Sequence, residues 1–445
     1  MHNKLSKTAI AISLAIAAGH SAQAALYAVD PGPYLEENGK FAAWYQDTHG
    51  RVLDLCLSKA ISSRSGGDGD GPAYMCSFPP LEEGFDVDQP IVFPSNFPGE
   101  SFWFTADAEI ADAASGIELR YGAALEAAFA VEEPAEGDQV AFARIRVRVD
   151  VPQPGLYTVT HPYGVEVFDV TQEIFDDTEG DRAINMTRDL GIGAPYDYTG
   201  ALNGDLGPFL RSVNGPYTEG SETFIGDPNL EEPVTGSPFD TNYVRIEGPN
   251  GIDLRTNLFA ISGKLSSVVR ETPVIVQRAT YSRSSGGSGV VAQQDVFVQA
   301  PPPPATASYV DTAGLGIPMS EANGTGNWYG QSASNPTTLP GQLSLTANNQ
   351  PAIPTSTPTT VTPALVDLVQ IRRAEYSLSS GQITLEATTS DQTAPPTLTA
   401  VGIGTLSGSG ATKTLTTGIS PIPPAFVQVT SANGGSDTEE VVILP

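Results

Sequence analysis

The sequence predicts an all-β protein, in which a β-rich N-terminal domain precedes two tandem copies of one β-sandwich module. Three observations lead to this class. The 45 Gly and 37 Pro leave little room for continuous helices. Short runs of Val, Ile, Thr, Tyr and Phe are bounded by turn residues, as is typical of strands. Finally, a stretch in the C-terminal third of the chain recurs further on, which indicates a duplicated unit.

The first residues have the pattern of a signal peptide. Lys4 and Lys7 precede an apolar stretch over 8–18, and Ala22-Gln23-Ala24 forms a cleavage box. We expect residues 1–24 to be removed. No later stretch approaches the roughly 20 apolar residues of a transmembrane helix. The mature protein is therefore predicted to be secreted, extracellular or at the cell surface, with the periplasm as the alternative location.

The two cysteines, Cys56 and Cys76, both follow the signal. In an oxidising compartment one disulfide is the simplest prediction. The alternative, a pair of metal ligands, would need further thiols or histidines. The mature chain has just two of the latter, His49 and His161.

The net charge of -29 makes nucleic acid an improbable partner, because phosphate binding requires clustered Lys and Arg. From Pro301 onward there are only nine acidic residues, so the acidity is concentrated in the first two thirds of the chain. Such a charge favours solubility and divalent cations. An extracellular protein or a polysaccharide is the expected partner.

The N-terminal region, residues 25–265, has no visible repeat. Its clearest strand covers 142–151, where Ile and Val alternate with three arginines. The following Pro154-Gly155-Leu156-Tyr157 resembles the closing strand of PKD and immunoglobulin-like sandwiches, which implies that its tyrosine forms a corner hydrogen bond. The Ala-rich stretch 108–130 is a candidate for a short helix, although its glycines count against one. One large domain, or two divided near 135, are both compatible with this sequence.

The C-terminal part contains the repeat. Three matches occur in the same order with unequal gaps, which describes one module duplicated with loop insertions. They pair 276–286 with 371–381, 314–316 with 402–404, and 340–349 with 424–433. In the second copy Ile383, Leu385 and Ala387 share one face of the next predicted strand, so a hairpin is expected.

Units of this length and strand pattern resemble the immunoglobulin-like modules of bacterial extracellular proteins, although the Cys-Trp-Cys signature of that family is missing. The resemblance implies module 1 at 266–363 and module 2 at 364–445, and it implies no activity. The Pro/Thr-rich stretch 352–363 is predicted to be an extended linker. The run Pro301–Pro304 must be an edge or a loop.

Asp68 and Asp70 lie in an acidic, Gly-rich loop between the cysteines. Alternating Asp and Gly let oxygens converge on one calcium ion, so calcium is the candidate cofactor here. The motif is only a fragment of a calcium loop, and a plain solvated loop is the preferred interpretation. The nearby Asp86 and Asp88 add little to it.

Two sets of side chains are weighed as ligand sites. The aromatic run 102–104, with 44–45 upstream, is either a platform for a sugar or part of the core, and core packing is preferred for Phe102 and Phe104. Packing beside a turn is also preferred for 328–329. The row Arg144, Arg146 and Arg148 is either an anion site or a set of cross-strand ion pairs, and ion pairs are preferred.

Catalytic patterns are weak. A Ser-His-Asp arrangement would need His49, flanked by Asp47 and Asp54, or His161 as its base, and there is no G-x-S-x-G motif. A pair of carboxylates for glycoside hydrolysis is not recognisable from spacing. Catalytic residues therefore stay unknown.

The leading hypothesis is a secreted or cell-surface structural or adhesive binding protein without catalytic activity, in which residues 25–265 carry recognition and the tandem pair serves as a spacer. The alternative is a secreted hydrolase or carbohydrate-active enzyme with accessory modules. A third, weaker hypothesis is a calcium-stabilised surface-layer component.

Overall fold

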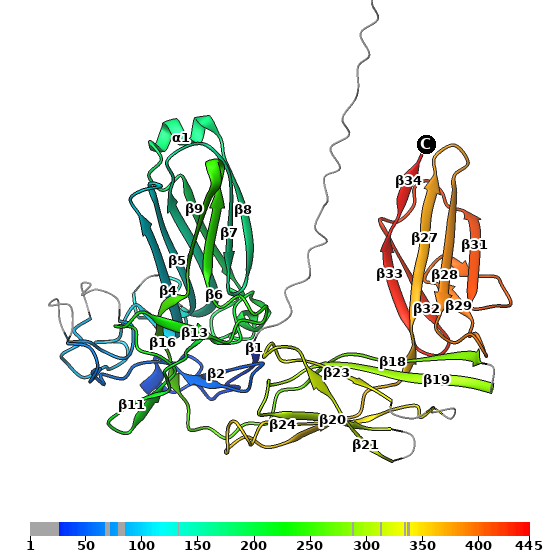
Figure 1. Ribbon diagram of the computed structural model, residues 1–445. Coiled ribbons are helices and arrows are strands. Elements are labelled where there is room, and N and C mark those ends of the chain that lie inside the picture. Colours follow the sequence, from blue (N-terminus) through cyan, green and yellow to red (C-terminus); the bar gives the residue numbers. More distant parts are fainter. Residues whose placement is uncertain are drawn as a thin grey trace, which may run out of the picture.

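The computed structural model describes residues 26–66, 72–78, 85–131, 133–286, 289–311, 314–332, 335 and 339–445. In this part of the chain the strands form seven sheets, and α1 (Gln172–Thr178) is the one α-helix. The predicted all-β class is confirmed. Figure 1 shows two upright groups of strands joined by a third group that lies across the bottom.

Two sheets of the N-terminal region face each other across a common hydrophobic core. Tyr157 from one sheet and Ile145 and Val147 from the other belong to the same buried cluster. The larger sheet is ordered β10 (Arg211–Ser212), β13 (Glu232–Thr235), β16 (Leu258–Ser262), β4 (Glu100–Asp112), β5 (Ile117–Phe129), β6 (Gln139–Asp150) and β9 (Ile184–Leu190). The smaller is ordered β15 (Ile252–Thr256), β14 (Val244–Gly248), β7 (Gly155–His161) and β8 (Gly164–Val170).

The Ala-rich stretch is not helical: it forms most of the hairpin of β4 and β5. Ala106, Ala108 and Ala123 are almost fully buried, because their side chains point to the core face of these strands. The turn between the strands places Gly116 at φ 75°, a conformation that glycine adopts readily. β5 pairs directly with β6, so one continuous sheet crosses residue 135.

A third sheet closes the base of the N-terminal region. Its order is β1 (Leu26–Val29), β2 (Trp44–Asp47), β3 (Val52–Asp54), β17 (Lys264–Leu265), β12 (Glu222–Phe224) and β11 (Tyr217–Glu219). Cys56 and Cys76 form the predicted disulfide beside it, with Cα atoms 5.4 Å apart. They pack with Met75 and Phe224 in a small buried cluster.

Residues 275–367, the first repeat, form two further sheets around their own buried cluster. The first sheet is ordered β22 (Ser320–Glu321), β23 (Asn327–Gln331), β19 (Gly289–Gln299), β18 (Ile275–Gly286) and β26 (Val366–Asp367). The second is ordered β21 (Gly316–Pro318), β20 (Thr306–Val310), β24 (Ser344–Asn348) and β25 (Thr359–Val361).

Residues 369–444, the second repeat, follow the same strand order around a third cluster, except that the edge strand β22 has no counterpart. One sheet is ordered β31 (Thr412–Gly418), β28 (Gln382–Thr389), β27 (Val369–Ser377) and β34 (Val442–Leu444). The other is ordered β30 (Gly404–Thr405), β29 (Leu398–Ala400), β32 (Phe426–Ser431) and β33 (Ser436–Glu440).

The duplicated segments occupy equivalent places in the two repeats. β18 and β27 each pair antiparallel with the next strand, and each has a register shift at the same point of the repeat, after Val276 and after Ile371. Each also pairs in parallel with the last strand of its own repeat, beside Tyr281 and Tyr376 respectively. A shared bulge and a shared parallel strand are specific enough to support duplication of one unit.

The stretch 352–363 is not a linker, because 359–361 form β25 within the first repeat. The chain passes from one repeat to the next at Leu368, between β26 and β27. The run Pro301–Pro304 lies in the loop between β19 and β20, as expected for residues that cannot donate to a ladder.

Candidate functional site

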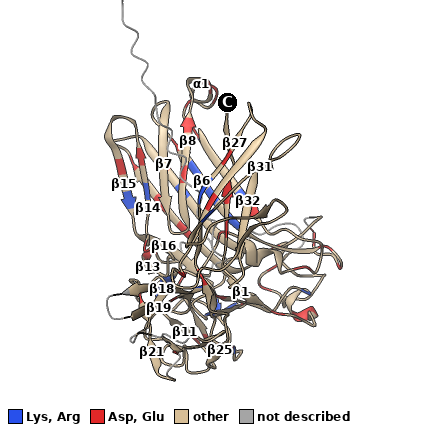
Figure 2. Ribbon diagram, turned by 90° about the vertical axis from the view of Figure 1, so that its right-hand side faces the viewer, with Lys and Arg blue, Asp and Glu red and all other residues tan. Residues whose placement is uncertain are grey.

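The outer face of β4, β5 and β6 contains a hollow of about 500 Å³. Figure 2 shows blue, basic stretches along β6 in a ribbon that is mostly tan. On β6, Arg144, Arg146 and Arg148 face this side, while the residues between them are buried in the core. Gly122 lies opposite Arg146 on β5. A Cβ atom there would be 3.1 Å from an Asp107 carboxylate oxygen, so the missing side chain leaves room between acid and base.

Arg144 pairs with two carboxylates, those of Asp189 and Glu126. Its guanidinium binds Asp189 on β9 through two hydrogen bonds of 2.6 and 2.9 Å, and it lies 2.9 Å from Glu126 on β5. The hydrogen bond to Asp189 is the main cause that raises the pKa of Arg144. Glu126 is only 3% exposed, and desolvation raises its pKa to about 7 against the effect of Arg144. The predicted cross-strand ion pair is confirmed for this arginine.

Arg146 and Arg148 do not follow that prediction. The residue opposite Arg148 on β5 is Arg120, so the register places two like charges side by side. In the described part of the chain neither Arg146 nor Arg148 makes an ion pair, and the buried Nε of Arg148 has no hydrogen-bond partner. Desolvation, followed by the charges of Arg146, Arg182 and Arg120, lowers the pKa of Arg148. Among the described residues, Arg148 thus lines the hollow without an ion-pair partner.

Two carboxyl groups in the hollow have raised pKa values, Asp107 and Glu126. Desolvation raises the pKa of Asp107 to about 6 despite the opposing charge of Arg146. Asp107 lies opposite Gly122, four residues from Glu126 along β5, which is about 13 Å. The carboxyl pair of a glycosidase is about 5 to 10 Å apart. The backbone positions of this pair are further apart than that.

The aromatic run meets the hollow in a way that differs from the prediction. Trp103 and Phe104 are both fully buried, whereas Phe102 is partly exposed and lines the hollow. The cause is a register shift between Phe102 and Phe104, which places Trp103 outside the regular alternation. Core packing is therefore right for Phe104 and wrong for Phe102.

Two further aromatic predictions concern packing. Trp328 is buried and donates to the carbonyls of Ala300 and Pro301, so it packs beside a turn as predicted. The hydroxyl of Tyr157 donates to the carbonyl of Gln153 at 2.7 Å, which is the predicted corner hydrogen bond. These side chains are structural.

The histidines are buried and poorly placed for base catalysis. His49 is 2% exposed, and burial together with Arg51 lowers its pKa to about 3. Its Nε2 lies 3.4 Å from the carbonyl oxygen of Thr325, and its Nδ1 has no partner among the described residues. Asp47 instead accepts backbone N–H groups. His161 is fully buried beside Tyr121.

The calcium candidates Asp68 and Asp70 lie outside the described residues. Nearby, Asp86 accepts the amide of Asp88 in a local turn. Over the ranges that the structure describes, no three His, Cys, Asp or Glu side chains are grouped to hold a metal ion.

Within the same ranges no helix is long and apolar enough to cross a membrane.

No family model and no curated relative match this chain. Among solved structures it is similar to a chain from work on the host cell surface retention of a 1.5-MDa bacterial ice-binding adhesin. The identity is 11%, the match covers 69% of this chain and 91% of the other, and the TM-score is 0.15. A likeness of this size carries no argument about function.

Proposed function

We propose that this chain is a secreted or cell-surface structural and adhesive protein without catalytic activity. In this proposal residues 25–265 form the recognition domain, and 266–363 and 364–445, with the structural boundary at Leu368, form two immunoglobulin-like spacer modules. The disulfide supports export, since such bonds persist in oxidising compartments. The repeated strand order supports one duplicated module.

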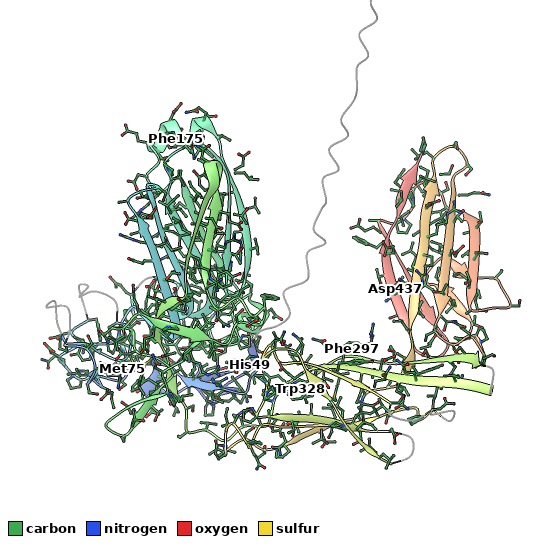
Figure 3. The ribbon with its side chains drawn as sticks, in the orientation of Figure 1. His49, Met75, Phe175, Phe297, Trp328 and Asp437 are labelled. Atoms are coloured by element: carbon green, nitrogen blue, oxygen red, sulfur yellow. A yellow bond between two sulfur atoms is a disulfide. The ribbon has the colours of Figure 1, made fainter. Side chains whose placement is uncertain are left out.

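The observation that carries the proposal is that both junctions between neighbouring units are built from buried side chains. Figure 3 places His49 where the N-terminal region meets the first repeat. There the side-chain amide of Asn349 donates to the carbonyl of His49 at 3.2 Å. A Cβ atom on Gly326 would be 3.1 Å from His49 Nε2, so the glycine allows the close approach. In this proposal such buried contacts restrict motion between neighbouring units, so that the units act as a stiff spacer.

The second junction is also polar and buried. Arg283 of the first repeat pairs with Asp391 of the second, whose side chain is fully buried. The hydroxyl of Tyr281 donates to the same carboxylate and accepts from the side-chain amide of Asn433. A chain held at both junctions would present the hollow of the N-terminal region at a fixed distance from the last repeat.

We propose that the hollow binds an extracellular protein or a polysaccharide. Its acidic and basic groups can accept from and donate to hydroxyl or amide groups, and Arg148 can receive an acidic group. The calcium site at Asp68 and Asp70 stays a separate proposal. If that site exists, a chelator will lower the melting temperature of the mature protein.

A binding panel of acidic and neutral polysaccharides and surface proteins, offered to the immobilised chain 25–445, tests the function. We expect one member to bind, and Arg148→Glu to weaken that binding by roughly tenfold or more. Arg255→Glu is the matched control, because Arg255 is exposed on the other sheet and stacks on Tyr243. Release of reducing ends from a bound polysaccharide would favour the hydrolase, and equal binding by both variants would contradict the proposal.

A further inference from the structure

A pocket of about 310 Å³ lies where the N-terminal region meets the first repeat, away from the hollow. Arg51, from the turn before β3, and Arg211, on β10, line it from the N-terminal region. Arg270, in the segment that leads into the first repeat, forms another wall. Residues 352–356 of the first repeat complete the lining. The two units thus build this pocket together.

The segment 352–356 is fixed over the pocket by hydrogen bonds. The amide of Thr357 donates to the carbonyl of Arg270 at 3.0 Å, and the amide of Thr272 donates back to Thr357. Ser356 is 4% exposed, and its hydroxyl bonds that of Thr272 at 3.0 Å. The pocket wall is therefore part of the junction, and a ligand bound here contacts both units.

The three arginines share an excess of positive charge. In the part of the chain that the structure describes, none of the three makes an ion pair or a side-chain hydrogen bond. The buried Asp47 partly offsets the charges of Arg51 and Arg211, but its oxygens already accept the amides of Arg51 and Phe209. The pocket thus gathers three guanidinium groups in a protein whose net charge is -29.

Arg270 supplies independent evidence for a missing partner. Its guanidinium lies 4.2 Å from the ring centre of the buried Trp44, so stacking fixes its plane. Its Nε is buried and has no hydrogen-bond partner among the described residues. A buried donor without an acceptor is costly, and a charged donor more so. An oxyanion in the pocket would satisfy this group.

The charges of the neighbouring arginines support the same conclusion. Burial, with a further contribution from Arg51, lowers the pKa of Arg211 to about 10. Burial also lowers the pKa of Arg51. The two guanidinium groups thus repel each other, and an anion between them would relieve this repulsion.

Most of the remaining lining residues are apolar, which narrows the class of ligand. Val52, Ile225, Leu265, Val268 and Ile353 line the pocket. The volume lies at the lower end of the range for small-molecule sites. We propose that this pocket binds a small organic anion, with its carboxylate, sulfate or phosphate group at Arg51, Arg211 and Arg270 and its apolar body against these side chains. Because the anion contacts both units, its binding strengthens their junction.

Two probes of one shape test the charge requirement. Calorimetric titration of the mature chain with cyclohexanecarboxylate and with neutral cyclohexanecarboxamide compares an anion with its uncharged analogue, and sulfate and phosphate test the bare oxyanion. We expect the carboxylate to bind and to raise the melting temperature, and the amide to bind roughly tenfold or more weakly. Equal binding of the two, or no binding of any probe at millimolar concentration, would overturn the proposal.

Variants locate the site. Arg211→Gln removes one charge, and we expect it to weaken carboxylate binding by roughly tenfold or more, while Arg211→Lys retains part of it. Arg255→Gln is the control and should bind like the parent protein, since Arg255 lies outside the pocket. Should Arg211→Gln unfold, Arg51→Gln makes the same test. A folded variant at either position that binds normally would also overturn the proposal.

Discussion

The two repeats share one strand order, yet their corresponding tyrosines have different surroundings. Tyr281 donates to Asp391 and accepts from Asn433, both in the second repeat. Tyr376 donates instead to the carbonyl of Ile419 within its own repeat. The tyrosine of the first repeat thus contacts the neighbouring repeat, whereas the equivalent tyrosine of the second repeat bonds only within its own repeat.

The difference continues two residues further on. Arg283 exchanges backbone hydrogen bonds with Ser390 and Gln392 of the second repeat. The residue at the same place of the second repeat is Leu378, which is 66% exposed and whose amide bonds Leu444 of the last strand. Both repeats therefore share the strand order. They differ in a few side chains at the end of the first strand, and in the first repeat these side chains contact the next repeat.

The largest effect is expected from Arg283→Leu, which gives the first repeat the residue of the second. It leaves the buried Asp391 carboxylate without its cation, and removing one partner of a buried ion pair costs about 3 kcal/mol or more. Denaturant unfolding of the mature chain, followed by hydrogen exchange of β18 and β27, measures this loss. Unchanged exchange in both strands would show that the ion pair does not hold the junction.

Lowering the pH should reversibly remove the stability that the Arg283–Asp391 pair contributes. Burial raises the pKa of Asp391, but hydrogen bonds from Arg283 and from the amide of Ala394 outweigh it and hold the pKa below its usual range. A depressed carboxyl pKa stabilises the folded state above the unfolded pKa of about 4, and this contribution is lost as the pH falls through the lower folded value. Hydrogen exchange of β18 from neutral pH to pH ~3 should show loss of protection only in the acid part of the range. Asp391→Asn should remove this pH dependence.

Removing the two hydroxyls separates the roles of the tyrosines. Tyr281→Phe and Tyr376→Phe should each cost about 1 kcal/mol, as is usual for one hydrogen bond. Hydrogen exchange should increase in both repeats after Tyr281→Phe, and only in the second repeat after Tyr376→Phe. Effects confined to the first repeat after Tyr281→Phe would contradict the assigned contact.

The smallest effect is expected from Leu378→Arg, the reverse of the first substitution. Leu378 is exposed, so an arginine there loses no buried contact, and the free energy of unfolding should change by at most about 0.5 kcal/mol. Denaturant unfolding of Leu378→Arg and of Arg283→Leu under the same conditions compares their free energies of unfolding directly. A loss as large as that of Arg283→Leu would mean that exposure does not explain the difference between the repeats.

The alternation of apolar and polar residues along the sequence predicted several strands of the fold. The strand around Arg144 and the hairpin after Tyr376 could be identified, because side chains on a strand repeat every second residue. Phe102 was misjudged, since a bulge between Phe102 and Phe104 breaks the alternation of faces and leaves no simple mark in the sequence. The Ala-rich stretch was misjudged because alanine favours helices locally, whereas here the tertiary core selects the strand.

The partners of charged residues depend on register and on long-range contacts, which a single sequence does not encode visibly. Arg144 lies opposite Asp189 and is paired, but Arg148 lies opposite Arg120. The guanidinium of Arg283 pairs with Asp391, which lies 108 residues further along the chain. The pocket arginines come from three separate segments, so no motif could have indicated them.

The account depends most on a fixed junction between the two repeats, and a distance distribution between them tests it directly. Spin labels at Thr306→Cys and Ser379→Cys, both exposed, lie on different repeats, and the native cysteines are engaged in their disulfide. We predict one narrow distance distribution for the mature chain and a broad one after Arg283→Leu. A broad distribution in the parent protein would contradict the account.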